Sequence, residues 1–236
     1  ASDVYKRQTF SRARSVDKDG KIVGEYRGED GPIHGFIYEG GTISTYDIAI
    51  EDATSTRLTG INDNGVLIGT YVDGSGKLIS FQDDQGIITT TGELVHNAIN
   101  NLGQIVGVYC PDSTSNRGYL YENGVIITVP DENMPSQAWD INNAGIIVGD
   151  FTSSGTLGFM LVDGEVIVFD YPGADSGTYL TGINDLGTVV GIYQDTSLGY
   201  ARSLGFVAVV PLSSTFLLFG SGLLGLGLLG WRRKRD

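Results

Sequence analysis

The sequence predicts an all-β protein: a β-propeller of about five four-stranded blades built from tandem ~40-residue repeats, followed by one C-terminal transmembrane helix. Three observations support this. A motif of eleven residues occurs five times, its first glycines lying 45, 38, 42 and 42 residues apart. Short apolar runs flank each copy, and an uncharged span with a basic end closes the chain. Repeats of this length are typical of propeller blades.

The recurring motif predicts two strands joined by a tight turn. In residues 61–71, Asn62 and Gly65 bound the turn, because Asn tolerates left-handed backbone and Gly takes positive φ without strain. Consecutive apolar residues after the turn predict a strand covered on both faces. The second glycine, Gly69, favours a bulge or close approach of a neighbouring sheet, and we expect Tyr71 to fold over it. The other copies are residues 16–26, 99–109, 141–151 and 183–193.

Further short runs complete each repeat. One run leads into the motif, as at residues 56–61, and two follow it, as at 79–81 and 87–91. This gives four strands per unit of about forty residues, which corresponds to one propeller blade. The last unit lacks the fourth run, so residues 9–16 could complete it and close a ring. An open solenoid is the alternative architecture.

The chain divides into three parts. Residues 1–8 match neither the repeat nor a signal peptide and look like a non-native leader, whereas residues 9–210 carry the repeats and residues 211–236 differ in composition. The net charge is −13, and because the C-terminal end is basic, the repeat domain is more acidic still. Such a domain repels polyphosphate, so we expect no nucleic-acid partner.

Few side chains offer catalytic chemistry. Cys110 is the only cysteine, and His34 and His96 are far apart in sequence, so we expect no metal site, no cofactor and no catalytic residues. An Asn or Asp precedes every turn, and such oxygen ligands would suit calcium, although turn chemistry explains the residues without a metal. These residues are Asp17, Asn62, Asn100, Asn142 and Asn184.

One linker between repeats combines an aromatic ring with two acids. Asp170, Tyr171 and Asp175 form a candidate ligand loop for a sugar or a cation, with a solvated turn as the alternative. A glycan-active hydrolase or lyase that uses loop carboxylates is the alternative to a non-enzymatic function. Such an enzyme would need two carboxyl groups roughly 5 to 10 Å apart in one cleft.

The C-terminal part predicts a membrane anchor. Residues 213–231 contain no charge, and a helix of this length would run roughly 28 Å, close to the thickness of the hydrocarbon core. Arg232, Arg233, Lys234 and Arg235 follow at once. By the positive-inside rule, this basic tail places the C-terminus in the cytoplasm and the repeats outside.

This C-terminal part resembles the PEP-CTERM sorting signal of Gram-negative bacteria. Pro211, Ser214 and Thr215 carry the resemblance together with the apolar span and the basic cluster, while Leu-Ser stands where the family has Glu-Pro. The resemblance implies export, transient retention in the inner membrane and processing by an exosortase-like enzyme. It also implies a final place at the cell surface, in species that make exopolysaccharide and biofilm.

The repeats resemble the HAF repeat of extracellular bacterial proteins. The run His34-Gly35-Phe36 and the pattern G-I-N-D-x-G-x-x-x-G at residues 60–69 and 182–191 carry this resemblance, with Gly in place of the family's Ala. The family implies no activity. We therefore expect an exported, C-terminally anchored envelope protein with a structural, adhesive or exopolysaccharide-associated role. Its expected partners are the membrane, an exosortase-like enzyme, and an exopolysaccharide or another envelope protein.

Overall fold

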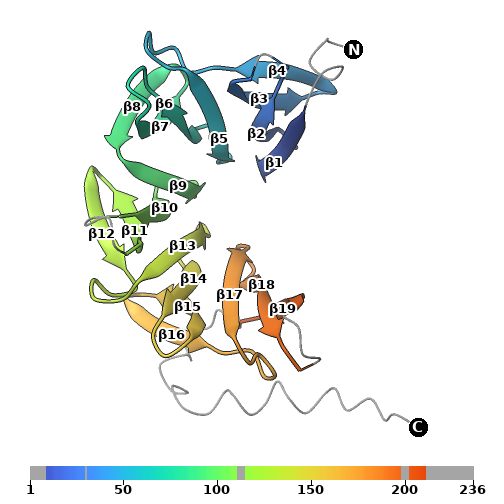
Figure 1. Cartoon of the computed structure of the whole chain (residues 1–236), viewed down its shortest axis with the longest axis vertical. Coiled ribbons are helices and arrows are strands. Elements are labelled where there is room, and N and C mark those ends of the chain that lie inside the picture. The colour runs from blue at the N-terminus through green and yellow to red at the C-terminus, as the bar shows by residue number, and fades with distance from the viewer. Residues whose placement is uncertain (1–8, 30, 111–114, 198–201, 211–236) are drawn as a thin grey trace.

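The protein is all-β. The computed structural model describes residues 9–29, 31–110, 115–197 and 202–210, which form nineteen strands and no helix. The strands form four sheets, one of which has seven strands, and we divide them into five antiparallel units, called blades 1 to 5, that are arranged as an open arc (Figure 1). The predicted helix at residues 213–231 lies outside the described residues, and no helix within them is long and apolar enough to span a membrane.

Each blade is a meander in which consecutive strands pair and the first strand lies innermost (Figure 1). The predicted four-stranded unit is confirmed in blades 1 to 4, and blade 5 has three described strands. Blades 4 and 5 also share one parallel bridge between Thr156 and Gly177. The strands are β1 Phe10–Val16, β2 Ile22–Arg27, β3 Ile33–Glu39 and β4 Thr42–Tyr46; β5 Ser55–Ile61, β6 Leu67–Val72, β7 Leu78–Asp84 and β8 Ile87–Gly92; β9 Leu94–Ile99, β10 Ile105–Tyr109, β11 Arg117–Glu122 and β12 Val125–Val129; β13 Ser136–Ile141, β14 Ile147–Thr152, β15 Thr156–Val162 and β16 Glu165–Phe169; and β17 Gly177–Ile183, β18 Thr188–Asp195 and β19 Arg202–Val209.

The N-terminal strand belongs to blade 1. It pairs with β2 from Phe10 opposite Arg27 to Val16 opposite Ile22, so the expectation that residues 9–16 complete the last blade is wrong. The tight turn after β1, in which the Gly20 N–H donates to the Asp17 carbonyl at 3.2 Å, explains this pairing. Closing a short loop costs less chain entropy than pairing with a distant strand. Blades 1 and 5 therefore remain the two separate ends of the arc (Figure 1).

The predicted tight turns are confirmed. In the second copy, the Asn62 side-chain oxygen accepts the N–H groups of Asn64 at 3.1 Å and Val66 at 3.0 Å. Gly65 takes a φ of 81°, in the region that favours glycine. Each turn thus gains its shape from one Asn or Asp side chain and one glycine, within five residues of sequence.

The second glycine of each motif lies under an aromatic ring of its own blade. A Cβ added at Gly69 would lie 2.1 Å from the Arg57 carbonyl oxygen and 2.8 Å from the Phe81 ring. The expectation that Tyr71 covers this glycine is wrong, because Phe81 stands directly opposite Gly69 in the β6–β7 register. The expected close approach therefore comes from within the blade. The same pairs are Gly24 with Phe36, Gly107 with Tyr119, Gly149 with Phe159, and Gly191 with Phe206.

The hydrophobic core lies between blades. At the first blade-to-blade contact, Val23 of blade 1 packs against Leu58 and Phe81 of blade 2. Because each blade is only one sheet thick, it must bury its apolar face against the next blade. We call each such contact a seam. The corresponding clusters centre on Ile68 and Ile105, on Val106 and Phe159, and on Val148 and Phe206.

Candidate functional site at the centre of the arc

The innermost strands β1, β5, β9, β13 and β17 converge at the centre of the arc (Figure 1). Residues of these strands and of the turns that follow them line a polar cavity. Its volume is about 460 Å³, and residues from all five blades line it. Equivalent positions of the five blades contribute one side chain each to the wall. These are Arg14, Thr59, Asn97, Trp139 and Thr181.

A β-bulge places each of these side chains at the cavity. In blade 4, Ala138 pairs with Gly149 and Asp140 pairs with Val148, so Trp139 is the extra residue of β13. Bulges bend a strand and re-aim side chains. The same register shift occurs in the innermost strand of every other blade, at Arg14, Thr59, Asn97 and Thr181.

The polar ends of the cavity residues are held by neighbouring groups. The Trp139 indole N–H donates to the Asp150 carboxylate at 2.5 Å, and the Asn97 amide donates to the Ala138 carbonyl of the next blade at 2.9 Å. The Thr59 and Thr181 hydroxyls donate to carbonyls of their own blades at 3.4 Å. Asn97 keeps its side-chain oxygen, and both threonines keep acceptor capacity. The wall therefore offers hydrogen-bonding groups at fixed positions.

Two carboxylates near the cavity are unusually basic. Burial raises the pKa of Asp140, which lines the cavity, to about 6 and likewise raises the pKa of Asp150 to about 6. Asp140 accepts the backbone N–H of Ile183 in blade 5 at 2.8 Å and that of Ile141 at 2.9 Å. It thus connects two blades, as the Ser15 hydroxyl does at the first seam with the backbone of Ile61.

A buried acid also lies at the first seam. The side chain of Glu25 is 4% exposed and contacts three guanidinium groups. Arg14 contacts it at 2.6 Å and Arg57 of blade 2 at 3.2 Å, while Arg12 is more distant at 3.7 Å. A buried carboxylate requires such partners, because an unpaired charge in this position would be costly.

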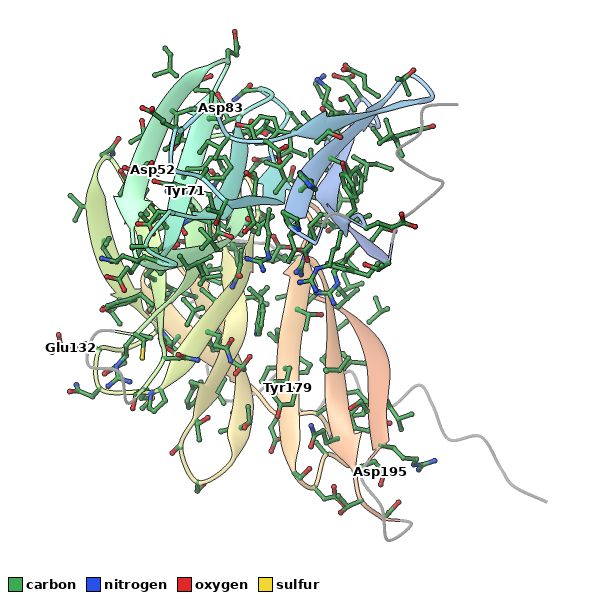
Figure 2. All side chains as sticks on the ribbon, turned by 45° about the horizontal axis from the view of Figure 1, so that its top comes forward. Asp52, Tyr71, Asp83, Glu132, Tyr179 and Asp195 are labelled. Atoms are coloured by element: carbon green, nitrogen blue, oxygen red, sulfur yellow. The ribbon has the colours of Figure 1, made fainter. Side chains whose placement is uncertain are left out.

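The Asn side chains of the turns also join the blades. The Asn62 amide nitrogen donates to the Asn100 carbonyl at 3.0 Å, and the same bond runs from Asn100 to Asn142 and from Asn142 to Asn184. This use of the amide groups agrees with the turn interpretation of the recurring Asn. The described residues contain no group of three or more His, Cys, Asp or Glu placed to hold a metal ion. The labelled acids Asp52, Asp83, Glu132 and Asp195 in Figure 2 are likewise dispersed over the molecule.

The predicted ligand loop lies between β16 and β17, and none of its three residues lines the central cavity. The Tyr171 ring stacks on Tyr193 with centroids 4.1 Å apart. The Asp175 carboxylate accepts the Thr196 N–H at 2.9 Å, and Asp170 accepts a long 3.5 Å hydrogen bond from Thr178. The loop residues thus contact blade 5 rather than the cavity, and ligand binding by them stays a prediction.

The histidines and the cysteine lie apart from the cavity. His96 is fully buried between Thr91 and Tyr119, and its burial lowers its pKa to about 3. His34 stacks on Tyr26 and contacts the Asp47 carboxylate at 3.0 Å. Cys110 is an exposed free thiol.

The predicted sorting-signal residues Pro211, Ser214, Thr215 and the basic cluster at 232–235 lie outside the described residues.

Sequence reasoning missed the residues of the cavity wall. A bulge leaves no local mark, because the extra residue is defined by a partner strand rather than by its own neighbours. The buried acids did carry a signal. Glu25 and Asp150 each stand between glycine and an aromatic residue in a strand that is otherwise apolar, and a charge at such a position requires a partner.

Comparisons with known proteins identify no family. The sequence matches no family model, and no curated protein matches it. Among solved structures, the chain is similar to the fucose-specific lectin from Aleuria aurantia, with 10% identity, 85% of this chain and 77% of the lectin covered, and a TM-score of 0.45. It is also similar to AofleA from Arthrobotrys oligospora, with 13% identity, 77% of this chain and 68% of AofleA covered, and a TM-score of 0.46. For the β-propeller domain of the Trilobed protease from Pyrococcus furiosus, the identity is 12%, 86% of this chain and 81% of that domain are covered, and the TM-score is 0.45. With TM-scores this low, these similarities carry no weight for function.

Proposed function

We propose that this protein is an exported, C-terminally anchored envelope protein whose five-bladed propeller binds extracellular polysaccharide at the central cavity without chemically altering it. The observation that carries the proposal is the wall of the cavity. All five blades contribute a bulge residue to it, and together these supply hydroxyl, amide, guanidinium and indole groups. Sites of this kind hold a polar ligand by a few fixed hydrogen bonds and an aromatic surface.

The carboxylates support binding rather than catalysis. Asp140 already accepts two backbone N–H groups, and Asp150 accepts the Trp139 indole N–H. A catalytic acid or base must instead reach the proton that it transfers. The glycan-active enzyme remains the second candidate, because a pKa of about 6 at Asp140, beside the cavity, suits a general acid.

The envelope location rests on the sequence of the C-terminal part. The uncharged span at residues 213–231 and the basic cluster that follows it have the length and charge pattern of an anchor whose preceding domain is outside the cell. The resemblance to a PEP-CTERM signal adds an exosortase-like enzyme as a processing partner. A polysaccharide-binding domain would then face the extracellular matrix.

Binding is tested with the full chain in mild detergent and immobilised cellulose, dextran, alginate and xanthan. Retention on at least one polymer is expected. Asn97→Ala removes a wall amide and Thr181→Tyr narrows the cavity, so each should weaken that retention by about tenfold. Thr89→Ala, on the exposed β8 strand, is the matched control and should bind like wild type. Failure to bind any polymer, equal binding by all variants, or release of new reducing ends would each contradict the proposal.

Location is tested separately by cell fractionation with an antibody to the repeats. Full-length protein in the inner membrane indicates a plain anchor. A product shortened by about 2 to 3 kDa in the outer fraction indicates processing near Pro211, because residues 211–236 are 26 of the 236 residues that together weigh 25.2 kDa. Soluble full-length protein in the cytoplasm would contradict the envelope assignment.

A further inference from the structure

Among the described residues, no segment covers the outer face of blade 5. Val190 on β18 is 42% exposed, although the four equivalent residues Val23, Ile68, Val106 and Val148 are all 0% exposed. Those four are covered by the blade that follows. Ile192, Val207 and Val209 are also exposed on this side of the blade, as the β18–β19 register places them. Blade 5 therefore presents the apolar half of a seam.

The hydrogen-bonding groups of that half-seam are also unused. Asn62, Asn100 and Asn142 are 3–4% exposed, and each donates its amide to the following blade. Asn184, in contrast, is exposed, and no described residue accepts a hydrogen bond from its amide nitrogen. The backbone N–H of Asp185 likewise has no acceptor among the described residues, whereas that of Asn143 donates to the Asp185 carboxylate at 2.8 Å.

A notch in the same face lacks the side chain that fills it elsewhere. A Cβ added at Gly158 would lie 2.9 Å from Leu180, and one added at Gly35 would lie 3.1 Å from Leu58, because the next blade occupies that space. Among the described residues, a Cβ at the equivalent Gly205 would meet only a backbone oxygen of Gly191 at 3.9 Å. The notch at Gly205 is open.

Blade 1 presents the complementary half. Ala13 is exposed, whereas its counterparts Leu58, Ala138 and Leu180 are 0% exposed because each is buried in the seam with the preceding blade. Val16 is 60% exposed, against 5% for Ile61. At the seam between blades 3 and 4, the backbone nitrogen of Ala138 lies 3.0 Å from the position of a Cβ added at Gly118. Ala13 is small enough to approach the notch at Gly205 in the same way.

We propose that a second copy of this chain docks its blade 1 on blade 5 of the first, forming a head-to-tail contact that repeats the internal seams. Within the described part of the chain both half-seams are uncovered, because the internal seams set the curvature of the arc and keep its ends apart (Figure 1). A second copy can supply the missing half without changing that curvature. The contact is heterologous, using a different surface on each partner.

Charge favours the same contact. At the internal seams, the residue that follows the turn Asn contacts its counterpart in the next blade. For example, the Asn143 side-chain amide donates to the Asp185 carboxylate at 2.7 Å. At the new contact, Lys18 of the second copy stands opposite Asp185 of the first. An ammonium group and a carboxylate attract each other there, and the Asn184 amide gains the Asp17 carbonyl of the second copy as its acceptor.

The test uses the full chain in mild detergent, with mass measured by sedimentation equilibrium over a wide concentration range. Wild type should associate reversibly. Val190→Asp and Ala13→Asp should each weaken association more than about tenfold, because each buries an unpaired charge in the contact. Ile87→Asp, at an exposed apolar position on β8, is the matched control and should associate like wild type. Thermal unfolding of each variant checks that the fold is intact.

Mixing the two face variants distinguishes the head-to-tail arrangement from the alternatives. The Val190→Asp chain keeps an intact blade 1 and the Ala13→Asp chain keeps an intact blade 5, so the mixture should form a 1:1 dimer and stop there. Monomeric wild type, a mixture that stays monomeric, or loss of association with Val190→Asp alone would overturn the proposal. Association that all variants retain would assign it to the C-terminal part and overturn it as well.

Discussion

The side-chain nitrogen of Asn100 lies 3.0 Å from the carbonyl oxygen of Asn142, the equivalent residue of the next blade. The side-chain oxygen of the same Asn100 accepts the N–H groups of Leu102 and Gln104, both at 3.0 Å, within its own turn. One amide group therefore shapes a hairpin and joins it to its neighbour. This double use links local turn formation to the assembly of the arc.

Asn100→Ala should destabilise the protein strongly. It removes the acceptor of two backbone N–H groups and the donor to a buried carbonyl, which together should cost about 2 to 4 kcal/mol. The measurement is the free energy of unfolding in urea. Asn184→Ala is the matched comparison, because Asn184 accepts the same two turn bonds but its amide nitrogen donates to no described residue of its own chain. Equal losses for the two variants would show that the bond between blades contributes nothing.

Asp150→Asn should stabilise the protein at neutral and alkaline pH. Burial raises the folded-state pKa of Asp150 from 3.8 to about 6, so its contribution to stability is fully present below about pH 4 and is lost as the pH rises through about 6. The variant escapes this loss, and its amide oxygen can still accept the Trp139 indole N–H. At about pH 8 its free energy of unfolding should exceed that of wild type by up to about 3 kcal/mol. The two proteins should converge near pH 4, and a constant difference across the pH range would contradict the prediction.

Gly149→Ala should prevent stable folding of blade 4. The added methyl group would lie 2.1 Å from the Gln137 carbonyl oxygen, which belongs to the β13–β14 ladder, and 2.6 Å from the fully buried Phe159 ring. We expect a loss of more than about 3 kcal/mol, measured by thermal unfolding. Gly155→Ala, whose added methyl group meets nothing within 4 Å, is the control and should unfold near the wild-type temperature.

Calcium should not stabilise the repeat domain. The turn residues Asn62, Asn100 and Asn142 use their side-chain oxygens for backbone N–H groups and their nitrogens for the next blade. A cation that bound only the folded state would raise the unfolding temperature by mass action. Unfolding temperatures measured with added Ca²⁺ and with a chelator should therefore agree, and a rise with Ca²⁺ that a chelator reverses would restore the calcium interpretation.

Local features of the sequence were sufficient for most of the fold. The predicted runs at residues 56–61, 79–81 and 87–91 lie within β5, β7 and β8, because short apolar and β-branched runs between turns define a strand without reference to distant residues. The turn at Gly65 was predictable for the same reason. Asn, Gly and their spacing determine its geometry within a few positions.

Features that depend on partners were not predictable. Phe81, rather than Tyr71, covers Gly69 because of the β6–β7 register, and the pairing of β1 within blade 1 depends on competition between two edges. The cavity residue Trp139 was missed because a bulge exists only relative to the neighbouring strand. The candidate loop around Tyr171 was predicted from its composition, which does not determine where a side chain points. In the structure, the Tyr171 ring stacks on Tyr193.

Because the seams between blades are alike, whole repeats can be added to or removed from the protein by changes in its gene. Excising residues 100–141 would place Asn142 directly after Ile99 and leave Asn62 facing a motif of the same kind. Unequal exchange between repeats can therefore change the reach of the arc in a single genetic event, with every remaining contact already compatible. In the first unit, Asp17 and Lys18 replace the Asn and the following Asn or Asp of the other units. The first unit is therefore the only one whose turn sequence suits a single position in the array.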